Sequence, residues 1–323
     1  MGKSIMITSF KGGVGKSTVS VNLAIGFAVN KYKVLIIDLD ASSGSIDLFM
    51  GCESNTLYNF CDVIEGKVKI EDAVYSKNSD FNPNKKDNIP GEIYYSVDVL
   101  KSPSYYEAEM LTASTAEAND LDDSDDLSSP DNMDNPEDSN NNVNNINKEI
   151  GRFITNAKNL YDFIIFDCPP GRFAFFDGLI KHTDFIFVIT LHSAASIRSS
   201  EKIALFLSEK GSSGENVRLI INCFNPAGIA KGFNLGIVDI IERSKIKLIG
   251  LIEINNLIRD YQELGKTVYD VKSKKLRSFF DDIIGRILES NIILNKRYNG
   301  IKTNTLYFKN EEKNKIKFKG FNF

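Results

Sequence analysis

The sequence is poor in the side chains that build metal sites. Its 323 residues include only two histidines, His182 and His192, which cannot supply a multi-histidine site and are expected to be local polar residues. Four cysteines lie far apart and form no CxxC pair: Cys52, Cys61, Cys168 and Cys223. We expect reduced, mostly buried thiols, and this spacing argues against a zinc or iron–sulfur site.

Long apolar runs are also missing. No run reaches the roughly 18 residues that a membrane-spanning helix needs. The N-terminus enters a strand pattern almost at once, over Ser4–Ser9, which leaves no room for a signal peptide. The sequence therefore predicts a cytoplasmic protein.

Basic residues are absent from one long stretch. Ser102–Asn147 contains twelve Asp or Glu and no Lys or Arg, so the net charge of −4 becomes +8 when this stretch is left out. Asp, Asn, Ser and Glu dominate it, and its few apolar residues cannot offset the entropy lost on ordering. We therefore predict that residues 101–148 form an acidic, disordered insertion, whose simplest role is that of a tolerated spacer.

Elsewhere, buried strand patterns alternate with helical ones. The predicted strands are Ser4–Thr8, Lys33–Asp38, Asp162–Asp167, Phe185–Thr190, Val217–Asn222 and Lys247–Ile252. The predicted helices are Lys16–Asn30, Ile197–Lys210, Gly236–Ile241 and Leu276–Ile292. Continuous apolar strands are typical of a parallel sheet covered on both faces.

We therefore predict one α/β domain with a doubly wound, mostly parallel sheet, right-handed crossovers and helices on both faces. Its two parts are residues 1–100 and 149–292, separated by the insertion. A basic, aromatic tail, residues 293–323, follows the domain.

The most specific motif is Lys11–Thr18, KGGVGKST, between the first strand and the first helix. Glycines let backbone N–H groups close on phosphate oxygens, and the helix N-terminus adds positive potential. Lys16 is predicted to reach the β- and γ-phosphates and Ser17 to ligate Mg²⁺. The ordinary P-loop pattern has a glycine where this chain has Phe10. The predicted nucleotide-binding residues are Gly12, Gly13, Val14, Gly15, Lys16, Ser17 and Thr18.

Three aspartates follow buried strands on the phosphate side. Asp38 and Asp40 close the second strand, and Asp167 precedes the turn Cys168–Gly171. Carboxylates in such positions hold magnesium or orient an attacking water.

KGGVGKST, with its extra lysine Lys11, resembles the deviant Walker A motif of the MinD/ParA family of ATPases. The resemblance implies that ATP and Mg²⁺ bind here and that Lys11 crosses a homodimer interface to the partner's nucleotide. It implies that Ser17, Asp38 and Asp167 serve the magnesium, with Asp167 as the Walker B aspartate. It also implies that Asp40 positions the hydrolytic water, so that the catalytic residues are Lys11, Lys16 and Asp40.

Within the family the resemblance is stronger to MinD than to ParA, and it runs from about Lys3 to Arg286. It rests on Ile46–Glu53, Leu57–Phe60, Asp62–Gly66, Asn222–Gly232 and Lys247–Ile252. It implies that Asn222 reads adenine. It further implies a slow ATPase, stimulated by a protein partner of unknown identity, which places a division septum or a polar organelle such as the flagellum.

The chain departs from the family pattern at three places. Ala41–Ser45 replaces the usual residues after the second aspartate, where hydrolysis is controlled. Glu253 stands where a proline near the base is usual. His192–Ser193 stands where a Pro-Glu pair is common, near the surface that the activating partner uses.

The sequence is also compatible with two other functions. One is a nucleotide-dependent scaffold that binds ATP and dimerises but hydrolyses it poorly. The other is a ParA-like DNA-partition ATPase, whose DNA binding would depend strongly on salt, although nucleic acid is not the expected partner. A metal-cluster carrier of the same superfamily lacks support because the bridging CxxC is absent.

The tail Lys296–Phe323 holds eight Lys or Arg against Glu311 and Glu312. By resemblance, its end could anchor the dimer at the inner face of the membrane, and Lys and Phe residues suit an anionic interface. However, the residues alternate with the period of a strand. Thr305–Lys309 and Lys315–Lys319 could equally pair as a hairpin across Asn310–Asn314, or the tail could be disordered.

Overall fold

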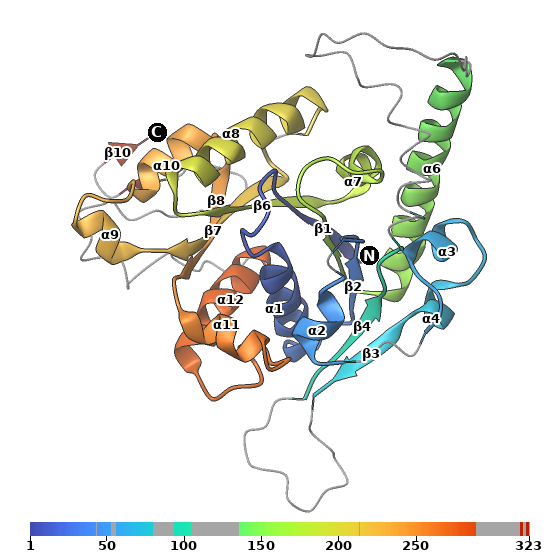
Figure 1. Ribbon diagram of the computed structural model, residues 1–323, viewed down its shortest axis with the longest axis horizontal. Helices are drawn as coiled ribbons and strands as arrows, with labels where there is room; N and C mark the ends of the chain where they lie inside the picture. The colour runs from blue at the N-terminus through green and yellow to red at the C-terminus, as the bar shows by residue number, and fades with distance from the viewer. Residues whose placement is uncertain are drawn as a thin grey trace, which may run out of the picture.

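The computed structural model describes residues 1–42, 44–52, 56–79, 94–104, 107, 136–212, 214–288, 317–318 and 321–322. Its centre is an eight-stranded sheet in the order β3-β4-β2-β5-β1-β6-β7-β8 (Figure 1). The strands are β1 (Lys3–Thr8), β2 (Val34–Asp38), β3 (Tyr75–Asn78), β4 (Ser96–Leu100), β5 (Phe163–Asp167), β6 (Phe185–Leu191), β7 (Val217–Phe224) and β8 (Lys247–Glu253). Within this sheet, all pairings are parallel except that of the edge strand β3 with β4. The predicted α/β fold is confirmed.

Helices cover both faces of this sheet (Figure 1). Alternate residues of β1 separate the two cores: Ile5 and Ile7 face one, and Met6 faces the other. The first core lies under α1 (Lys16–Val29), α2 (Ile46–Met50) and α12 (Lys274–Ile287). The second lies under α3 (Phe60–Ile64), α6 (Pro136–Leu160), α7 (Phe176–His182), α8 (Ala194–Glu209) and α10 (Ile237–Ser244). In Figure 1, α1, α2 and α12 lie below the strands, α8 and α10 lie above them, and α3 and α6 lie to the right. The short helices α4 (Ile70–Ala73), α9 (Pro226–Ala230) and α11 (Asn256–Gln262) complete the set.

The helix α6 corrects one prediction. It begins at Pro136, so residues 136–148 are helical and the predicted disorder is wrong there. The reason lies in the residues that follow, because Ile150, Ile154 and Ala157 recur at helical spacing and are buried in the core. This buried face supports a helix that extends back into the acidic sequence. Apart from Lys101–Ser104 and Glu107, the rest of the predicted insertion lies outside the described residues.

The bounds of the C-terminal helix also differ from the prediction. Instead of Leu276–Ile292, it spans Lys274–Ile287. Ser273 caps its start by accepting a hydrogen bond from the N–H of Leu276 (3.4 Å), a local signal that apolar periodicity does not report. Similarly, Ser193 caps α8, which therefore begins at Ala194 and not at Ile197. The predicted helix Gly236–Ile241 is α10, which runs on to Ser244.

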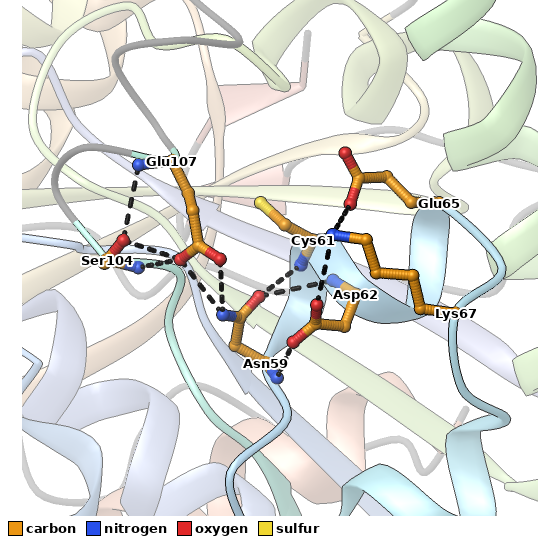
Figure 2. Close-up of polar contacts among 7 residues, drawn as sticks. All are labelled: Asn59, Cys61, Asp62, Glu65, Lys67, Ser104 and Glu107. Atoms are coloured by element: carbon orange, nitrogen blue, oxygen red, sulfur yellow. Dashed lines mark hydrogen bonds and ion pairs between the residues drawn. The ribbon is translucent and has the colours of Figure 1, made fainter.

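A polar network holds the chain where it leaves β4 (Figure 2). The side chain of Asn59 caps α3 by accepting from the N–H groups of Cys61 and Asp62. Its amide also donates to both carboxylate oxygens of Glu107, at 3.2 and 3.1 Å. Bonds from Ser104, led by its hydroxyl, lower the pKa of Glu107. The first residues beyond β4 are thus tied to α3.

In the part of the chain that the structure describes, no helix is both long enough and apolar enough to cross a membrane. At the C-terminus, β9 (Lys317–Phe318) pairs antiparallel with β10 (Phe321–Asn322). The other half of the predicted hairpin, Thr305–Lys309, lies outside the described residues, so that prediction stays open.

Candidate functional site

The glycine-rich loop joins β1 to α1 at the carboxyl end of the central strand (Figure 1). Gly13 and Gly15 have φ angles of 70° and 89°, in the left-handed region that favours glycine. Gly15 is the N-cap residue of α1 and provides no side-chain cap. The first turn of α1 therefore offers its N–H groups at the loop, as phosphate-binding helices do.

The two motif lysines lie in different environments. Lys16 is 7% exposed on the first turn of α1, whereas Lys11 is exposed. Ser9 holds the backbone of Lys11, because its hydroxyl donates to the Lys11 carbonyl (2.7 Å). The Ser9 carbonyl accepts from the N–H of Gly171 (2.9 Å), in the turn after β5. The loop that carries Lys11 is thus joined to that turn.

Asp38 and Asp167 are brought together in the sheet, since they form a register pair of β2 and β5. Asp38 is 4% exposed and Asp167 is fully buried. Burial raises the pKa of both carboxyls, and the neighbouring Asp167 raises that of Asp38 further. The hydroxyls of Ser17 and Ser20 and the charge of Lys16 offset part of the rise at Asp167. The result is a buried, electron-rich oxygen cluster beside a cation.

These oxygens suit a hard cation. The hydroxyl of Ser20 donates to Oδ1 of Asp167 (2.8 Å), while Oδ2 is buried and has no hydrogen bond within the described residues. The described residues contain no cluster of three or more His, Cys, Asp or Glu that could hold a metal by itself. The two buried carboxylates, Asp38 and Asp167, fit Mg²⁺, which keeps several waters and binds through one or two carboxylates and substrate phosphates.

Asp40 lies two residues beyond Asp38 and is 8% exposed. Its N–H donates to Oδ1 of Asp38 (2.9 Å), and its charge contributes to the raised pKa of both Asp38 and Asp167. The hydroxyl of Ser42 donates to Oδ1 of Asp40 (2.6 Å). The three predicted aspartates therefore occupy one electrostatic environment.

Asn222, near the end of β7, reaches the glycine-rich loop. Its side-chain amide donates to the carbonyl of Val14 (2.9 Å) and would clash with a side chain at Gly15. The next residue, Cys223, has a φ of 52°, which is unusual for a residue with a side chain, at an irregularity between β7 and β8. Asn222 thus stands beside the predicted nucleotide loop, and its role toward the base remains a prediction.

His192 has a structural role that the sequence did not reveal. It is 6% exposed and stacks on Phe224, with ring centroids 4.9 Å apart. Its Nδ1 accepts from the N–H of Asn225 (3.0 Å), and its Nε2 contacts the Leu235 carbonyl (2.8 Å). This histidine therefore fixes the loops after β7 to the end of β6. A lone histidine carries no signal from which these contacts could be predicted.

The aromatic residue that replaces the first P-loop glycine also has a defined role. Phe10 packs against the rings of Phe176 and Phe206, at centroid distances of 6.5 and 6.0 Å. Arg172, which follows Gly171, places its guanidinium 3.8 Å from the Phe206 centroid. The loop start, the turn after β5 and α8 are thereby connected by one aromatic cluster.

The four cysteines are free among the described residues. Cys61 and Cys168 are buried, and burial raises the pKa of both thiols, to about 12 for Cys61. Cys52 and Cys223 are half-buried. The expectation of buried thiols therefore holds fully for two of them.

The similarity of this chain to known proteins agrees with the family resemblance of its sequence motifs. A family model described as an AAA domain matches residues 2–208. The septum site-determining protein MinD of Neisseria meningitidis is 27% identical over 296 residues, which cover 90% of this chain and 93% of that protein.

Two solved structures share the fold. The MinC:MinD cell division protein complex of Aquifex aeolicus matches 91% of this chain and 99% of its own, with a TM-score of 0.67 and 22% identity. MinD from Pyrococcus horikoshii complexed with Mg-ADP matches 94% of this chain and 99% of its own, with a TM-score of 0.61 and 19% identity.

Proposed function

Because the chain belongs to the AAA domain family, in its MinD/ParA-type branch, we propose that it is an ATPase that dimerises on binding ATP. In this proposal it acts as a spatial regulator of the division septum or of a polar organelle such as the flagellum. It works in the cytoplasm and is stimulated by a protein partner. The observation that carries the proposal is the joint placement of Lys16, the exposed Lys11 and the aspartate cluster around one loop.

ATP would bind along Gly12–Thr18, with its phosphates on the N–H groups of the loop and of the first turn of α1. Lys16 is nearly buried, so its charge acts on the phosphates with little screening by water. Ser17, Asp38 and Asp167 would hold Mg²⁺, which neutralises phosphate charge when bound. Asn222 would read the base from beside Gly15.

Hydrolysis would depend on Asp40. A carboxylate that orients the attacking water lowers the barrier without adding affinity for ATP. Support comes from its position, since it is nearly buried and follows the strand that carries Asp38. We propose that turnover is slow for the protein alone and is stimulated by a partner, as the family resemblance implies.

Dimerisation would depend on Lys11. Its side chain is exposed, whereas its backbone is held by a hydrogen bond from Ser9. The side chain can therefore extend into solvent from a backbone that is held in place. By analogy with the family, it would contact the nucleotide of a second copy. The C-terminal tail would add peripheral membrane binding, and a hairpin or a disordered tail is the alternative.

A nucleotide-dependent scaffold is the second candidate function. It is favoured by the sequence Ala41–Ser45, which departs from the family pattern beside Asp40. Release of phosphate from ATP, measured with Mg²⁺ and with EDTA, separates the two functions. An ATPase releases phosphate only with Mg²⁺, while a scaffold dimerises with ATP and releases none.

The spatial role needs a test in cells. A fluorescent fusion should gather at the septum, oscillate or lie at a pole, and this pattern should be lost when Lys16 is replaced by Ala. A nucleoid-bound signal would favour DNA partition, and a diffuse signal for the wild-type fusion would contradict a positioning role.

A further inference from the structure

The loop between β2 and α2 is organised around the two aspartates that it follows. Asp38 accepts from the N–H groups of Asp40 (2.9 Å) and Ile46 (3.3 Å). Asp40 accepts from the N–H of Ser42 at Oδ1 (3.2 Å) and from the N–H of Gly44 at its carbonyl (2.8 Å). The donors in these bonds are backbone N–H groups, which every residue except proline provides.

The side chain of Ser42 adds a bond that depends on sequence. Its hydroxyl donates to Oδ1 of Asp40 with an oxygen–oxygen distance of 2.6 Å, in the range of charge-assisted hydrogen bonds. Only Ser or Thr could place a hydroxyl here from the same backbone. The bond lies in Ala41–Ser45, the segment in which this chain departs from its family.

The geometry of this bond limits the rotation of the carboxylate. Asp40 is 8% exposed, whereas Ser42 is exposed, so the surface loop reaches inward to a nearly buried group. The hydroxyl and the N–H of Ser42 both bind Oδ1, which fixes that oxygen toward the loop and thereby sets the plane of the carboxylate. Orientation of this kind matters for a group that must align a water with a phosphorus atom.

We propose that Ser42 is a positioning residue for ATP hydrolysis: its hydroxyl holds Oδ1 of Asp40 so that the carboxylate orients the attacking water. The inference rests on the proposed function, because Ser42 would have no such role in a protein that does not hydrolyse ATP. Ser42 itself contacts neither nucleotide nor water in this account. It acts on the rate through Asp40 alone.

The test compares steady-state ATP hydrolysis by wild-type protein with that of S42A, S42G and S42T. Loss of the hydroxyl in S42A and S42G should lower kcat about tenfold, as expected for a misoriented catalytic group, and leave KM for ATP unchanged. S42T keeps the hydroxyl and should restore most of the rate. Because Ser42 is exposed, S42A removes no buried side chain, and its melting temperature should match that of the wild type.

Ser45 provides the matched control in the same loop. It precedes α2 as the N-cap residue but makes no side-chain capping bond, so S45A should keep the wild-type kcat. Wild-type kcat in S42A, or a loss in S42T equal to that in S42A, would overturn the role of the hydroxyl and leave the ATPase proposal standing. A wild-type protein that binds ATP but never hydrolyses it would overturn the proposed function and this inference with it.

Discussion

Asp38 and Asp167 lie side by side at the carboxyl ends of two neighbouring parallel strands, as a register pair of β2 and β5. Two buried carboxylates in this position repel each other, and burial together with this repulsion raises the pKa of Asp38. Lys16 contributes the opposite charge at Asp167. A divalent ion bound here would add a second positive charge to that of Lys16.

Lys16→Ala should abolish ATP binding. The variant removes a nearly buried cation that we propose contacts the phosphates, and we expect the affinity to fall at least about a hundredfold, which is roughly 3 kcal/mol. Equilibrium titration with a fluorescent ATP analogue measures this loss. Lys11→Ala is the matched control, because that lysine is exposed and should leave monomer binding intact. Unchanged affinity in the Lys16 variant would contradict the P-loop assignment.

Asp40→Ala should bind ATP normally and lose turnover by about a hundredfold or more, as for removal of a group that handles the reacting water. The dimer formed with ATP should then persist, since nothing converts it to the ADP form. Single-turnover hydrolysis and the lifetime of the dimer can be followed in the same sample. If the variant hydrolyses ATP at the wild-type rate, the water is oriented by some other residue.

The central sheet and the phosphate loop were predictable because their signals are local. Buried strands such as Val34–Asp38 are continuous apolar runs, and the loop has a specific spacing of Gly and Lys. The contacts of His192 with Asn225 and Leu235 were not predictable, since they join residues more than thirty positions apart through single side chains. The start of α6 was not predicted, because the composition of residues 101–148 as a whole is typical of disorder. The helix is instead supported by the buried apolar residues that follow this segment.

Asp184→Asn should destabilise the fold at neutral pH by about 1–2 kcal/mol, the range for hydrogen bonds to a charged group that is partly exposed. Asp184 accepts from the N–H (2.7 Å) and the hydroxyl (2.9 Å) of Ser4 and pairs with Lys158 at 2.7 Å. Burial alone would raise the pKa of this carboxyl, but Lys158 and Ser4 outweigh it, and the pKa is lowered from its ordinary value of 3.8. Chemical denaturation at pH 7 measures the difference.

The sign of the pH dependence follows from that lowered pKa. The stabilisation by Asp184 is fully present above the ordinary value of 3.8 and is lost as the pH falls through the folded-state pKa below it. The gap between wild type and D184N should therefore close in acid. The exposed pair Lys210–Asp177 is the control, and D177N should cost less than about 1 kcal/mol. Equal effects of the two substitutions would contradict this account of Asp184.

Deletion of Lys313–Phe323 should abolish binding to anionic vesicles if the tail is a membrane anchor. Each basic residue near such a surface adds about 1 kcal/mol, and each fully buried apolar side chain about 1.5–3 kcal/mol. One copy should bind weakly and a dimer strongly through effective concentration. Sedimentation of full-length and truncated protein with ATP or ADP measures this.

The charge of the tail can be tested separately. Replacement of Lys315, Lys317 and Lys319 by Gln keeps the aromatic residues and should weaken binding and its dependence on salt. Equal sedimentation of all samples, with either nucleotide, would remove the membrane from the account and favour the hairpin.

The dimer formed around ATP is tested most directly by multi-angle light scattering with a non-hydrolysable ATP analogue. Wild-type protein should have the mass of a dimer with the analogue and of a monomer with ADP. Lys11→Ala should bind the analogue but remain a monomer, because its exposed lysine is the group that would reach the second copy. A wild-type monomer with the analogue bound, or a Lys11→Ala variant that dimerises as the wild type does, would contradict the account.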